Sequence, residues 1–411
     1  MLEIANLPHL RPIHPFPARM APSIVWAELP PVLPNRGKRL CVLDPMAGSG
    51  TTIATARLLG HRAIGLDTDP LAVLIARAWS LDVDGNALSM KARQVVERAR
   101  ERARQLTIGE SYPPFADEET REFVRYWFDA TARRHLTALS ASIRAVRDEN
   151  LRTLLWCAFS RLIIVKSCGA SRAMDLAHSR PHRVYDRSPL KPLEAFEQAA
   201  RLVGLRAPFR PASGLPPATI LHADARHAPL ECGSVDVIVT SPPYLNAIDY
   251  LRGHKFSLIW MGRTIADLRG TRAANVGTEI GLSRQSEELG YVDEVLMNMG
   301  DLQRLPPRAV RMLRRYVVDL DGVLAEMSRV LREDGRCVMV VGDSNLHKIF
   351  VSNSGAITSL GKHHGLELVS RRSRPLPTGR RYLPPPGTLR SGSLLEARMR
   401  EEVILSLRKA G

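Results

Sequence analysis

Two short turns carry the residues whose types and spacing could do chemistry, and the first of them is rich in glycine. This Gly-rich turn follows an apolar run and opens into a helical pattern; its sequence is Asp44-Pro45-Met46-Ala47-Gly48-Ser49-Gly50-Thr51-Thr52. Glycines permit a tight turn and close approach of a ligand to the backbone, and the start of a helix offers unpaired N–H groups. The lysine of a P-loop and the third glycine of a dinucleotide motif are both missing from this turn. The turn is either an ordinary connection or the site of another nucleotide-like ligand.

Two acidic residues follow the next apolar runs, where further strands are expected to end. Asp67 lies 17 residues beyond Gly50, and a carboxylate one strand–helix unit on can accept both hydroxyl hydrogen bonds of a ribose. Asp224 ends a third run, where it could accept a hydrogen bond from an adenine amino group. Asp67 could instead cap a helix. Three such features on successive strands favour a ligand that contains adenosine.

The second turn combines hydrogen-bond acceptors with an aromatic face. This Pro-Pro turn is Ser241-Pro242-Pro243-Tyr244. Two prolines remove two N–H donors and hold the backbone extended, so the Ser241 hydroxyl and the Pro242 carbonyl are presented as acceptors. A planar ring with an amino group could stack on Tyr244 and donate to both acceptors. The alternative is a structural turn with an incidental tyrosine.

Together the two turns resemble the motifs of a known family. The Gly-rich turn and Thr240–Tyr244, preceded by His14-Pro15-Phe16-Pro17-Ala18-Arg19, are similar to those of S-adenosylmethionine-dependent DNA methyltransferases that modify exocyclic amino groups. The resemblance covers about residues 14–80, 217–262 and 318–409. It implies that S-adenosylmethionine is the cofactor and that the residues that bind it are His14, Phe16, Asp44, Pro45, Ala47, Gly48, Ser49, Gly50, Thr51, Asp67 and Asp224. It also implies that the target base is held by Ser241, Pro242, Pro243 and Tyr244.

The reaction implied by the resemblance is direct methyl transfer to N4 of cytosine or N6 of adenine, on a base that has left the duplex. Acceptors on the amino hydrogens would localise the nitrogen lone pair and stabilise the charge that develops. No cysteine occurs in residues 240–244, so the cysteine-dependent methylation of cytosine C5 is not expected at this turn. Family members with serine in the first motif position more often modify cytosine, and we therefore expect N4-cytosine methylation. N6-adenine methylation, an RNA substrate and an inactive DNA-binding protein are the alternatives.

The composition favours a polyanionic partner, which we expect to be double-stranded DNA. The 411 residues include 58 Lys and Arg against 42 Asp and Glu, for a formal net charge of +16. No apolar run approaches the ~18 to 20 residues of a membrane span, and the N-terminus lacks the pattern of an export signal. Five scattered cysteines without a C-x-x-C pair argue against a disulfide framework and a zinc site. We expect a cytoplasmic protein, without metal, that associates with the nucleoid through DNA, and a cognate restriction endonuclease is a candidate partner.

Short apolar runs alternate with helical patterns and predict an α/β fold, with a doubly wound, mostly parallel, seven-stranded Rossmann-like methyltransferase sheet. Continuous apolar runs are typical of strands buried on both faces. The expected strands are Leu40–Leu43, Arg62–Leu66, Thr219–Leu221, Val235–Thr240, Cys337–Val341, Leu366–Ser370 and Val403–Leu407. The expected flanking helices are Thr51–Leu59, Leu71–Trp79 and Leu320–Leu331.

Two interruptions divide the chain into five predicted segments. These are the cofactor half (1–85), a helical insertion (86–214), the base half (215–261), an Arg- and Gly-rich, partly mobile excursion (262–316) and the C-terminal part of the sheet (317–411). Within the helical insertion, the expected helices are Lys91–Leu106, Asp117–Val146, Leu151–Lys166 and Leu193–Val203.

Candidate DNA contacts lie in three of these segments. The helical insertion, as a candidate target recognition region, contributes His182 and Arg183, and the excursion is a further candidate. A basic Pro-rich loop over 371–393 contributes Arg371, Arg372, Arg374, Arg380 and Arg381. The arginines at 98, 100, 102 and 104 alternate with glutamates and are expected to form a solvated helix face.

Overall fold

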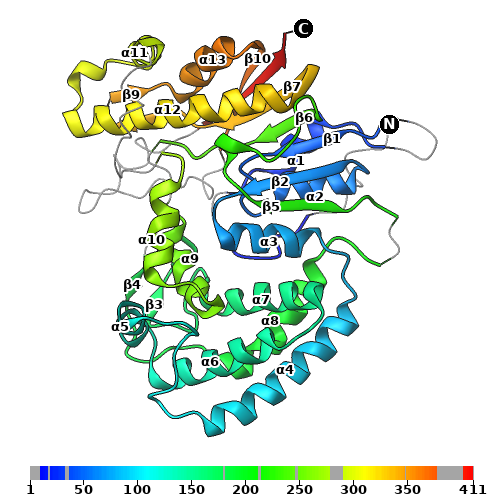
Figure 1. Ribbon diagram of the computed structural model, residues 1–411, viewed down its shortest axis with the longest axis vertical. Helices are drawn as coiled ribbons and strands as arrows, with labels where there is room; N and C mark the ends of the chain where they lie inside the picture. The colour runs from blue at the N-terminus through cyan, green and yellow to red at the C-terminus, as the bar shows by residue number, and fades with distance from the viewer. Residues whose placement is uncertain are drawn as a thin grey trace.

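The computed structural model describes residues 10–16, 19–32, 37–178, 181–211, 214–245, 249–277, 290–347, 349–376 and 401–410. The candidate DNA contacts Arg380 and Arg381 lie outside these ranges. A seven-stranded sheet with its flanking helices forms the upper part of the molecule in Figure 1, and the helices of the insertion form the lower part.

The sheet has the doubly wound order predicted from the sequence. Its strands, from one edge to the other, are β10 (Leu366–Pro375), β11 (Glu401–Lys409), β7 (Leu331–Val341), β6 (Val235–Thr240), β1 (Cys41–Asp44), β2 (Arg62–Asp67) and β5 (Ala218–His222). Only β11 runs antiparallel to its neighbours among these seven. The chain order reverses between β1 and β6, because β2 and β5 extend the sheet to one side and β7 to the other.

The central strands are buried on both faces, as their continuous apolar runs predicted. Val42 packs into the core beneath α1 (Pro22–Glu28) and α2 (Thr51–Leu58), whereas Leu43 packs into the core beneath α12 (Pro307–Val330) and α13 (Asn353–His363). Cys41 and Cys337 are buried free thiols in this second core.

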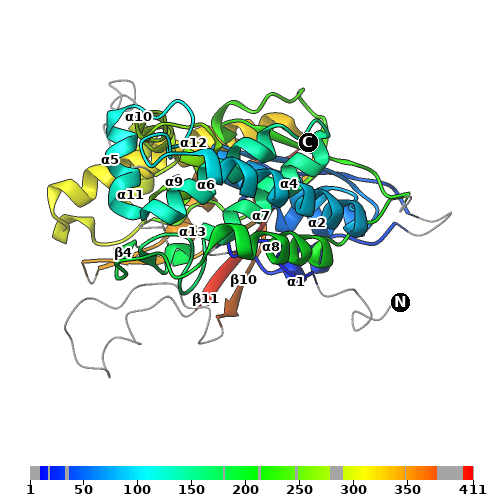
Figure 2. The same cartoon turned by 90° about the horizontal axis from the view of Figure 1, so that it is seen from below.

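In the described part of the helical insertion, four α-helices begin after aspartate caps, and a fifth begins at a proline that follows Lys191. These helices are α4 (Gly85–Gln105), α5 (Glu118–Trp127), α6 (Ala130–Arg144), α7 (Glu149–Ile163) and α8 (Pro192–Arg206), and Figure 2 shows α4, α6, α7 and α8 in front of the sheet. The single helix predicted over Asp117–Val146 is wrong, because Asp129 accepts hydrogen bonds from the N–H groups of Thr131 and Ala132 and begins a new helix. The arginines of α4 are exposed while Ala99 and Ala103 face the core, which confirms a solvated face.

The helical insertion shares its core with elements on both sides of it in the sequence. One continuous apolar cluster includes Trp79 of α3 (Pro70–Ser80), Phe159 of α7 and Phe256 of α9 (Leu251–Leu258). The chain that follows the Pro-Pro turn therefore packs into the helical insertion through α9 and the short helix η4 (Ile259–Met261). A small hairpin of β3 (Ala173–Met174) and β4 (His182–Arg183) lies on the same part of the molecule (Figure 1).

Two further predictions are corrected by the structure. The helix expected over Leu320–Leu331 begins at Pro307, because Ala309, Leu313 and Val317 continue its apolar face between arginines. The Pro-rich segment expected to be a loop from Arg371 begins as strand, since β10 runs to Pro375 and pairs with β11.

The excursion also contains regular structure in its described residues. It includes the helices α10 (Ile265–Ala274) and α11 (Gly290–Met297), together with the 3₁₀ turn η6 (Leu302–Arg304). A second hairpin, β8 (Ser344–Leu346) and β9 (Ile349–Val351), follows β7. No helix among the described residues is long and apolar enough to span a bilayer.

Candidate cofactor and base site

The Gly-rich turn and the Pro-Pro turn lie side by side at the carboxyl edge of the sheet. They follow β1 and β6, the neighbouring strands between which the chain order reverses. The Thr240 hydroxyl at the end of β6 donates a hydrogen bond of 2.7 Å to the Asp44 carboxylate at the end of β1. In open α/β sheets, ligands bind at this switch point. The fold therefore brings together the two turns that the sequence separates by almost 200 residues.

Glycine is required at two positions of the Gly-rich turn. Gly48 and Gly50 adopt φ angles of +51° and +86°, in the left-handed region. A Cβ at Gly50 would lie 2.9 Å from the Cβ of Ala76, so a larger residue would push α3 away. The N–H of Gly48 donates to Asp67 Oδ2 at 2.8 Å, and the N–H of Asp69 donates to Asp67 Oδ1 at 2.8 Å. These contacts fix the predicted ribose acid directly beside the turn.

Three carboxylates gather behind the Gly-rich turn, where Asp44 and Asp69 are buried and Asp67 is half-buried. Burial raises the pKa of Asp44 to about 6, although hydrogen bonds from Thr240 and Thr52 oppose the shift. Burial, followed by the charge of Asp69, raises the pKa of Asp67 to about 7. A cation at this site would stabilise the ionised forms of both groups. The site is therefore suited to a positively charged ligand, such as one with a sulfonium and an ammonium group.

The segment from His14 to Phe16 packs beneath the Gly-rich turn. A Cβ at Gly48 would lie 3.6 Å from the Phe16 ring, and that ring packs on Tyr250 and His254 of the chain after the Pro-Pro turn. His14 instead contacts the helical insertion, because its Nε2 lies 3.0 Å from the Ser160 hydroxyl. Burial lowers the pKa of His14 well below its usual value, so its imidazole is neutral. Of the two predicted residues, Phe16 lies at the turn and His14 supports the segment from behind.

A buried histidine joins the cofactor half to the base half. His254 Nδ1 lies 2.5 Å from Asp69 Oδ2, and the other Asp69 oxygen accepts from Leu71 at the start of α3. Both His254 and Asp69 are almost fully buried. Sequence reasoning missed this pair, whose members stand 185 positions apart.

The Pro-Pro turn is held by contacts on both of its sides. The Ser241 hydroxyl donates to the Tyr244 hydroxyl at 3.3 Å, and the Tyr244 ring packs against the apolar core under α12. The carbonyl of Leu245 accepts from the Ser344 hydroxyl at 3.2 Å. The side-chain amide of Asn353, which is fully buried, donates to Ser344 Oγ and to the carbonyl of Gly342, each at 2.8 Å. Sequence reasoning did not identify Ser344, at the start of β8, or Asn353, at the start of α13.

The third predicted acid, Asp224, lies at the end of β5, in line with the other two. Because β1, β2 and β5 are adjacent, Asp44, Asp67 and Asp224 follow one another along the carboxyl edge. Both Asp224 oxygens accept from the Arg226 guanidinium, with distances of 2.6 to 3.2 Å. Partial burial alone would raise the pKa of Asp224, but Arg226 outweighs it and lowers that pKa below its usual value. Asp224 is thus an ionised acceptor.

The candidate DNA contacts do not gather on one element. His182 and Arg183 are exposed on β4, and the Arg183 guanidinium lies over the Tyr126 ring. Arg371 and Arg372 lie on the edge strand β10, where Arg371 hydrogen-bonds to Ser354 and Arg372 pairs with Glu28. Arg374 is half-buried on the same strand, and its charge acts on Tyr244.

Comparison with known proteins finds similarity to two methyltransferases. No family model matches the chain. The Type II methyltransferase M.MvaI of Kocuria varians is 22% identical over 391 residues, which cover 89% of this chain and 84% of that protein. The Type II methyltransferase M.MjaII of Methanocaldococcus jannaschii is 20% identical over 433 residues, covering 85% and 75% respectively. The chain is therefore similar, over most of its length, to two Type II methyltransferases.

Solved structures of methyltransferases also match this chain. A DNA modification methylase of Thermus thermophilus, complexed with S-adenosylmethionine, is 20% identical and matches 46% of this chain and 54% of that chain, with a TM-score of 0.24. A methyltransferase of Methanosarcina mazei is 7% identical and matches 92% and 99%, with a TM-score of 0.33.

Proposed function

We propose that the protein transfers a methyl group from S-adenosylmethionine to N4 of a cytosine in double-stranded DNA. The observation that carries this proposal is the hydrogen bond between Thr240 and Asp44, which joins the Gly-rich turn to the Pro-Pro turn. A cofactor at the first turn and a base at the second would then meet at one edge of the sheet. Serine at the first position of the Pro-Pro turn supports cytosine as the base, as in the family members that carry serine there.

In this proposal, the cofactor lies along the row of three acids. The buried Asp44 and its neighbours in the Gly-rich turn hold the methionine end, with Phe16 packed beneath. Asp67 accepts hydrogen bonds from the ribose, and Asp224 accepts one from the adenine amino group. The raised pKa values of Asp44 and Asp67 support this arrangement, because a cationic ligand relieves the cost of burying their charges.

At the Pro-Pro turn, the protein prepares the amino group of an extrahelical base for attack. The Ser241 oxygen and the Pro242 carbonyl accept the two amino hydrogens, while Tyr244 stacks on the ring. This draws the nitrogen lone pair out of conjugation and aligns it with the methyl carbon. The new N–C bond forms as the C–S bond breaks, its electron pair stays on sulfur, and the nitrogen then loses a proton to water. S-Adenosylmethionine supplies the activated methyl group and leaves as S-adenosylhomocysteine.

The deciding experiment identifies the methylated nucleoside. The purified protein is incubated with methyl-labelled S-adenosylmethionine and mixed-sequence duplex DNA, and the digested nucleosides are separated and weighed by mass spectrometry. Label in N4-methylcytosine is expected. Label in N6-methyladenine would retain the mechanism but overturn the choice of base, and no label in DNA from a protein that binds S-adenosylhomocysteine would overturn the proposed reaction.

We also propose that basic side chains hold the DNA backbone. These are His182 and Arg183 on the β3–β4 hairpin and Arg371, Arg372 and Arg374 on β10. Arg371 and Arg372 already have acidic neighbours in Asp343 and Glu28, so replacing them should change affinity less than replacing Arg183. For Arg183→Gln, we expect a loss of affinity of a few fold and a smaller salt dependence of binding, by about one unit of logarithmic slope. An unchanged slope in fluorescence anisotropy titrations between low and moderate salt would remove the hairpin from the interface.

A further inference from the structure

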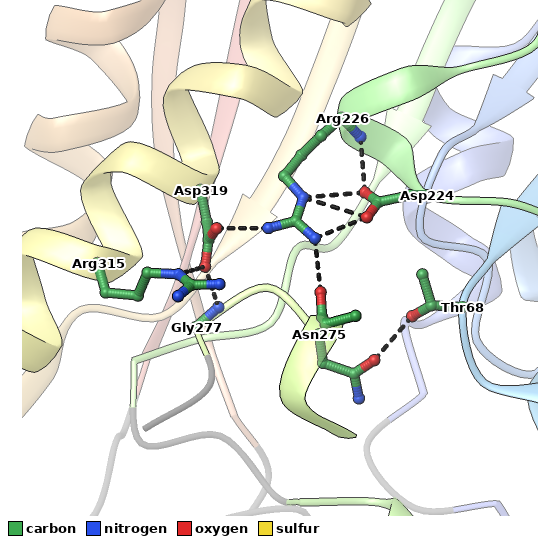
Figure 3. Close-up of polar contacts among 8 residues, drawn as sticks. Thr68, Asp224, Arg226, Asn275, Gly277, Arg315 and Asp319 are labelled. Atoms are coloured by element: carbon green, nitrogen blue, oxygen red, sulfur yellow. Dashed lines mark hydrogen bonds and ion pairs between the residues drawn. The ribbon is translucent and has the colours of Figure 1, made fainter. Parts of the chain in front are cut away.

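Arg226 stands at the meeting point of β5, α12 and the excursion, as Figure 3 shows. Two residues after Asp224, its guanidinium contacts that carboxylate through Nε at 3.0 Å and Nη2 at 2.6 Å. Its own backbone N–H also donates to Asp224 Oδ1 at 2.9 Å. One side of the Arg226 guanidinium therefore contacts Asp224, which follows β5.

The opposite face of Arg226 is held by Asp319 of α12. Arg226 Nη1 donates to Asp319 Oδ1 at 2.6 Å, and the Asp319 carboxylate is almost completely buried. Asp319 Oδ2 accepts from Arg315 Nε at 3.1 Å and from the N–H of Gly277 at 2.9 Å. The charges of two arginines and two aspartates thus balance one another. Because Asp319 is part of α12, that helix cannot shift without moving Arg226.

The excursion closes the network from a third side. Arg226 Nη2 donates to the carbonyl of Ala274 at 2.5 Å, at the end of α10, where the helix dipole favours a cation. The next residue, Asn275, accepts from the Thr68 hydroxyl at 3.0 Å. Since Thr68 directly follows Asp67, the segment from Ala274 to Gly277 is tied to the ends of both β2 and β5 (Figure 3).

The surroundings leave room for arginine at this place. Position 322 on α12 is glycine, and a Cβ there would lie 3.4 Å from Arg226 Cγ. The Arg226 side chain is 18% exposed, so its ion pairs are largely shielded from solvent. Charge-assisted hydrogen bonds of this kind are stronger than those on an open surface.

We propose that Arg226 is a positioning residue that fixes Asp224 for the adenine ring of the cofactor, and that α12 and the excursion contribute to cofactor recognition through it. The inference rests on the proposed function, in which Asp224 accepts from the adenine amino group. A carboxylate offers about four acceptor positions. Arg226 contacts Oδ1 through its backbone N–H at 2.9 Å and Nε at 3.0 Å, and Oδ2 through Nη2 at 2.6 Å and the same Nε at 3.2 Å. Because the one Nε–H is shared between the two oxygens, the three N–H donors leave one acceptor position, on a carboxylate that is held in a fixed orientation.

This arrangement assigns two tasks to one guanidinium. It keeps Asp224 ionised, which agrees with the lowered pKa of that carboxylate. It also stops the carboxylate from rotating. It also fastens the Ala274–Gly277 segment over the ends of the strands that carry Asp67 and Asp224. Asp319 should therefore influence cofactor affinity although it makes no contact with Asp224 in the described structure.

The test compares two probes that differ only in the group that Asp224 would recognise. S-Adenosylhomocysteine and its 6-deamino analogue, with hydrogen in place of the adenine amino group, are titrated calorimetrically into the wild type and four variants. Arg226→Gln removes the guanidinium. Asp319→Asn keeps the shape of the side chain that pairs with Arg226 but removes its negative charge. Two variants serve as matched controls. Asp321→Asn changes a residue of α12 that does not contact Arg226 in the described part of the chain, and Arg408→Gln breaks an exposed ion pair with Asp334.

We expect the wild type and both controls to bind S-adenosylhomocysteine about tenfold more tightly than the 6-deamino analogue. Arg226→Gln should reduce this ratio to nearly one, and Asp319→Asn should reduce it by a smaller factor, with both variants folded by circular dichroism. A structural role alone would weaken both probes equally, so an unchanged ratio in Arg226→Gln would overturn the inference while leaving the proposed function intact. If the wild type binds neither probe, or binds both equally, the assigned role of Asp224 fails and the inference falls with it.

Discussion

The Gly-rich turn and the Pro-Pro turn occupy neighbouring strand ends, but they are held by different physical means. Around the first, ionisable groups dominate: Asp44 is buried, Asp67 is half-buried, and the pKa values of both are raised. Around the second, neutral hydrogen bonds through Ser344 and Asn353 hold the backbone. The difference agrees with the proposal that the first turn holds a cation and the second a neutral ring with an amino group.

The sharpest way to break this comparison is to remove the hydroxyl of the Pro-Pro turn. For Ser241→Ala, we expect turnover to fall by about 100-fold, because one of the two acceptors for the amino group is lost. The affinity for S-adenosylhomocysteine should remain within a factor of about two, since Ser241 lies outside the row of acids. Single-turnover methylation and calorimetry measure the two quantities, and Ser234→Ala, just before the same strand, is the matched control. A loss of cofactor affinity as large as the loss of turnover would refute the division of roles.

The converse substitution addresses the Gly-rich turn. Asp67→Asn should weaken S-adenosylhomocysteine binding by roughly 10- to 30-fold, because it removes a charged acceptor beside the ribose. With saturating cofactor, the rate of methyl transfer should fall far less. Asp148→Asn is a suitable control, because asparagine caps a helix as well as the aspartate that it replaces. A rate defect that persists at saturation would place Asp67 in the chemical step instead.

The electrostatic character of the first turn predicts a pH dependence that the second turn lacks. Binding of a cationic cofactor favours ionised carboxylates, so affinity should rise with pH through the pKa values of about 6 and about 7 for Asp44 and Asp67. We expect S-adenosylmethionine to bind roughly tenfold more tightly at pH 8 than at pH 5.5.

Calorimetry in buffers of different ionisation enthalpy would detect the protons released at the lower pH. Asp67→Asn should flatten the profile, whereas Ser241→Ala should leave it unchanged. The same groups affect folding in the opposite sense: their folded-state pKa values are raised, so the stability that they confer is present at low pH and is lost as the pH rises towards 7. A wild-type profile without slope between pH 5.5 and 8 would contradict the electrostatic assignment.

The smallest expected effect concerns the support behind the Pro-Pro turn. Asn353→Ala removes both hydrogen bonds of a buried amide and should lower the free energy of unfolding by about 1 to 3 kcal/mol. The rate of methyl transfer should fall by a few fold because Leu245 is held less firmly, with cofactor affinity unchanged. Thr358→Ala, on the same helix, is the control for stability. Equal defects in the rate and in cofactor affinity would show that Asn353 supports the whole edge and not the turn alone.

The strands and the two turns could be predicted because their signals are local. An apolar run followed by Gly48-Ser49-Gly50 or by Pro242-Pro243 specifies both a strand and its end, with no knowledge of distant residues. Helix boundaries were less certain where charge masks the pattern. The arginines of α12 concealed the apolar face that begins at Ala309, and the cap at Asp129 divided one predicted helix into two.

The contacts that connect segments distant in the sequence could not be predicted. Arg226 and Asp319 stand 93 positions apart, and neither follows a motif whose chemistry demands the other. The same holds for His254 and Asp69, and for Asn353 with Ser344 behind the Pro-Pro turn. Arginine and aspartate are abundant in this chain, so residue type alone does not select one pair among many.

The sequence by itself determined the α/β class, the strand ends at which the three acids lie and the two turns of the proposed site. These features depend on backbone geometry and burial over a few neighbouring residues, which residue type controls directly. Only the tertiary structure decided how the turns are supported, that the excursion reaches the row of acids through Arg226, and that α9 belongs to the core of the helical insertion. Those outcomes depend on the packing of elements far apart in the chain, where the geometry of the whole fold selects the partners.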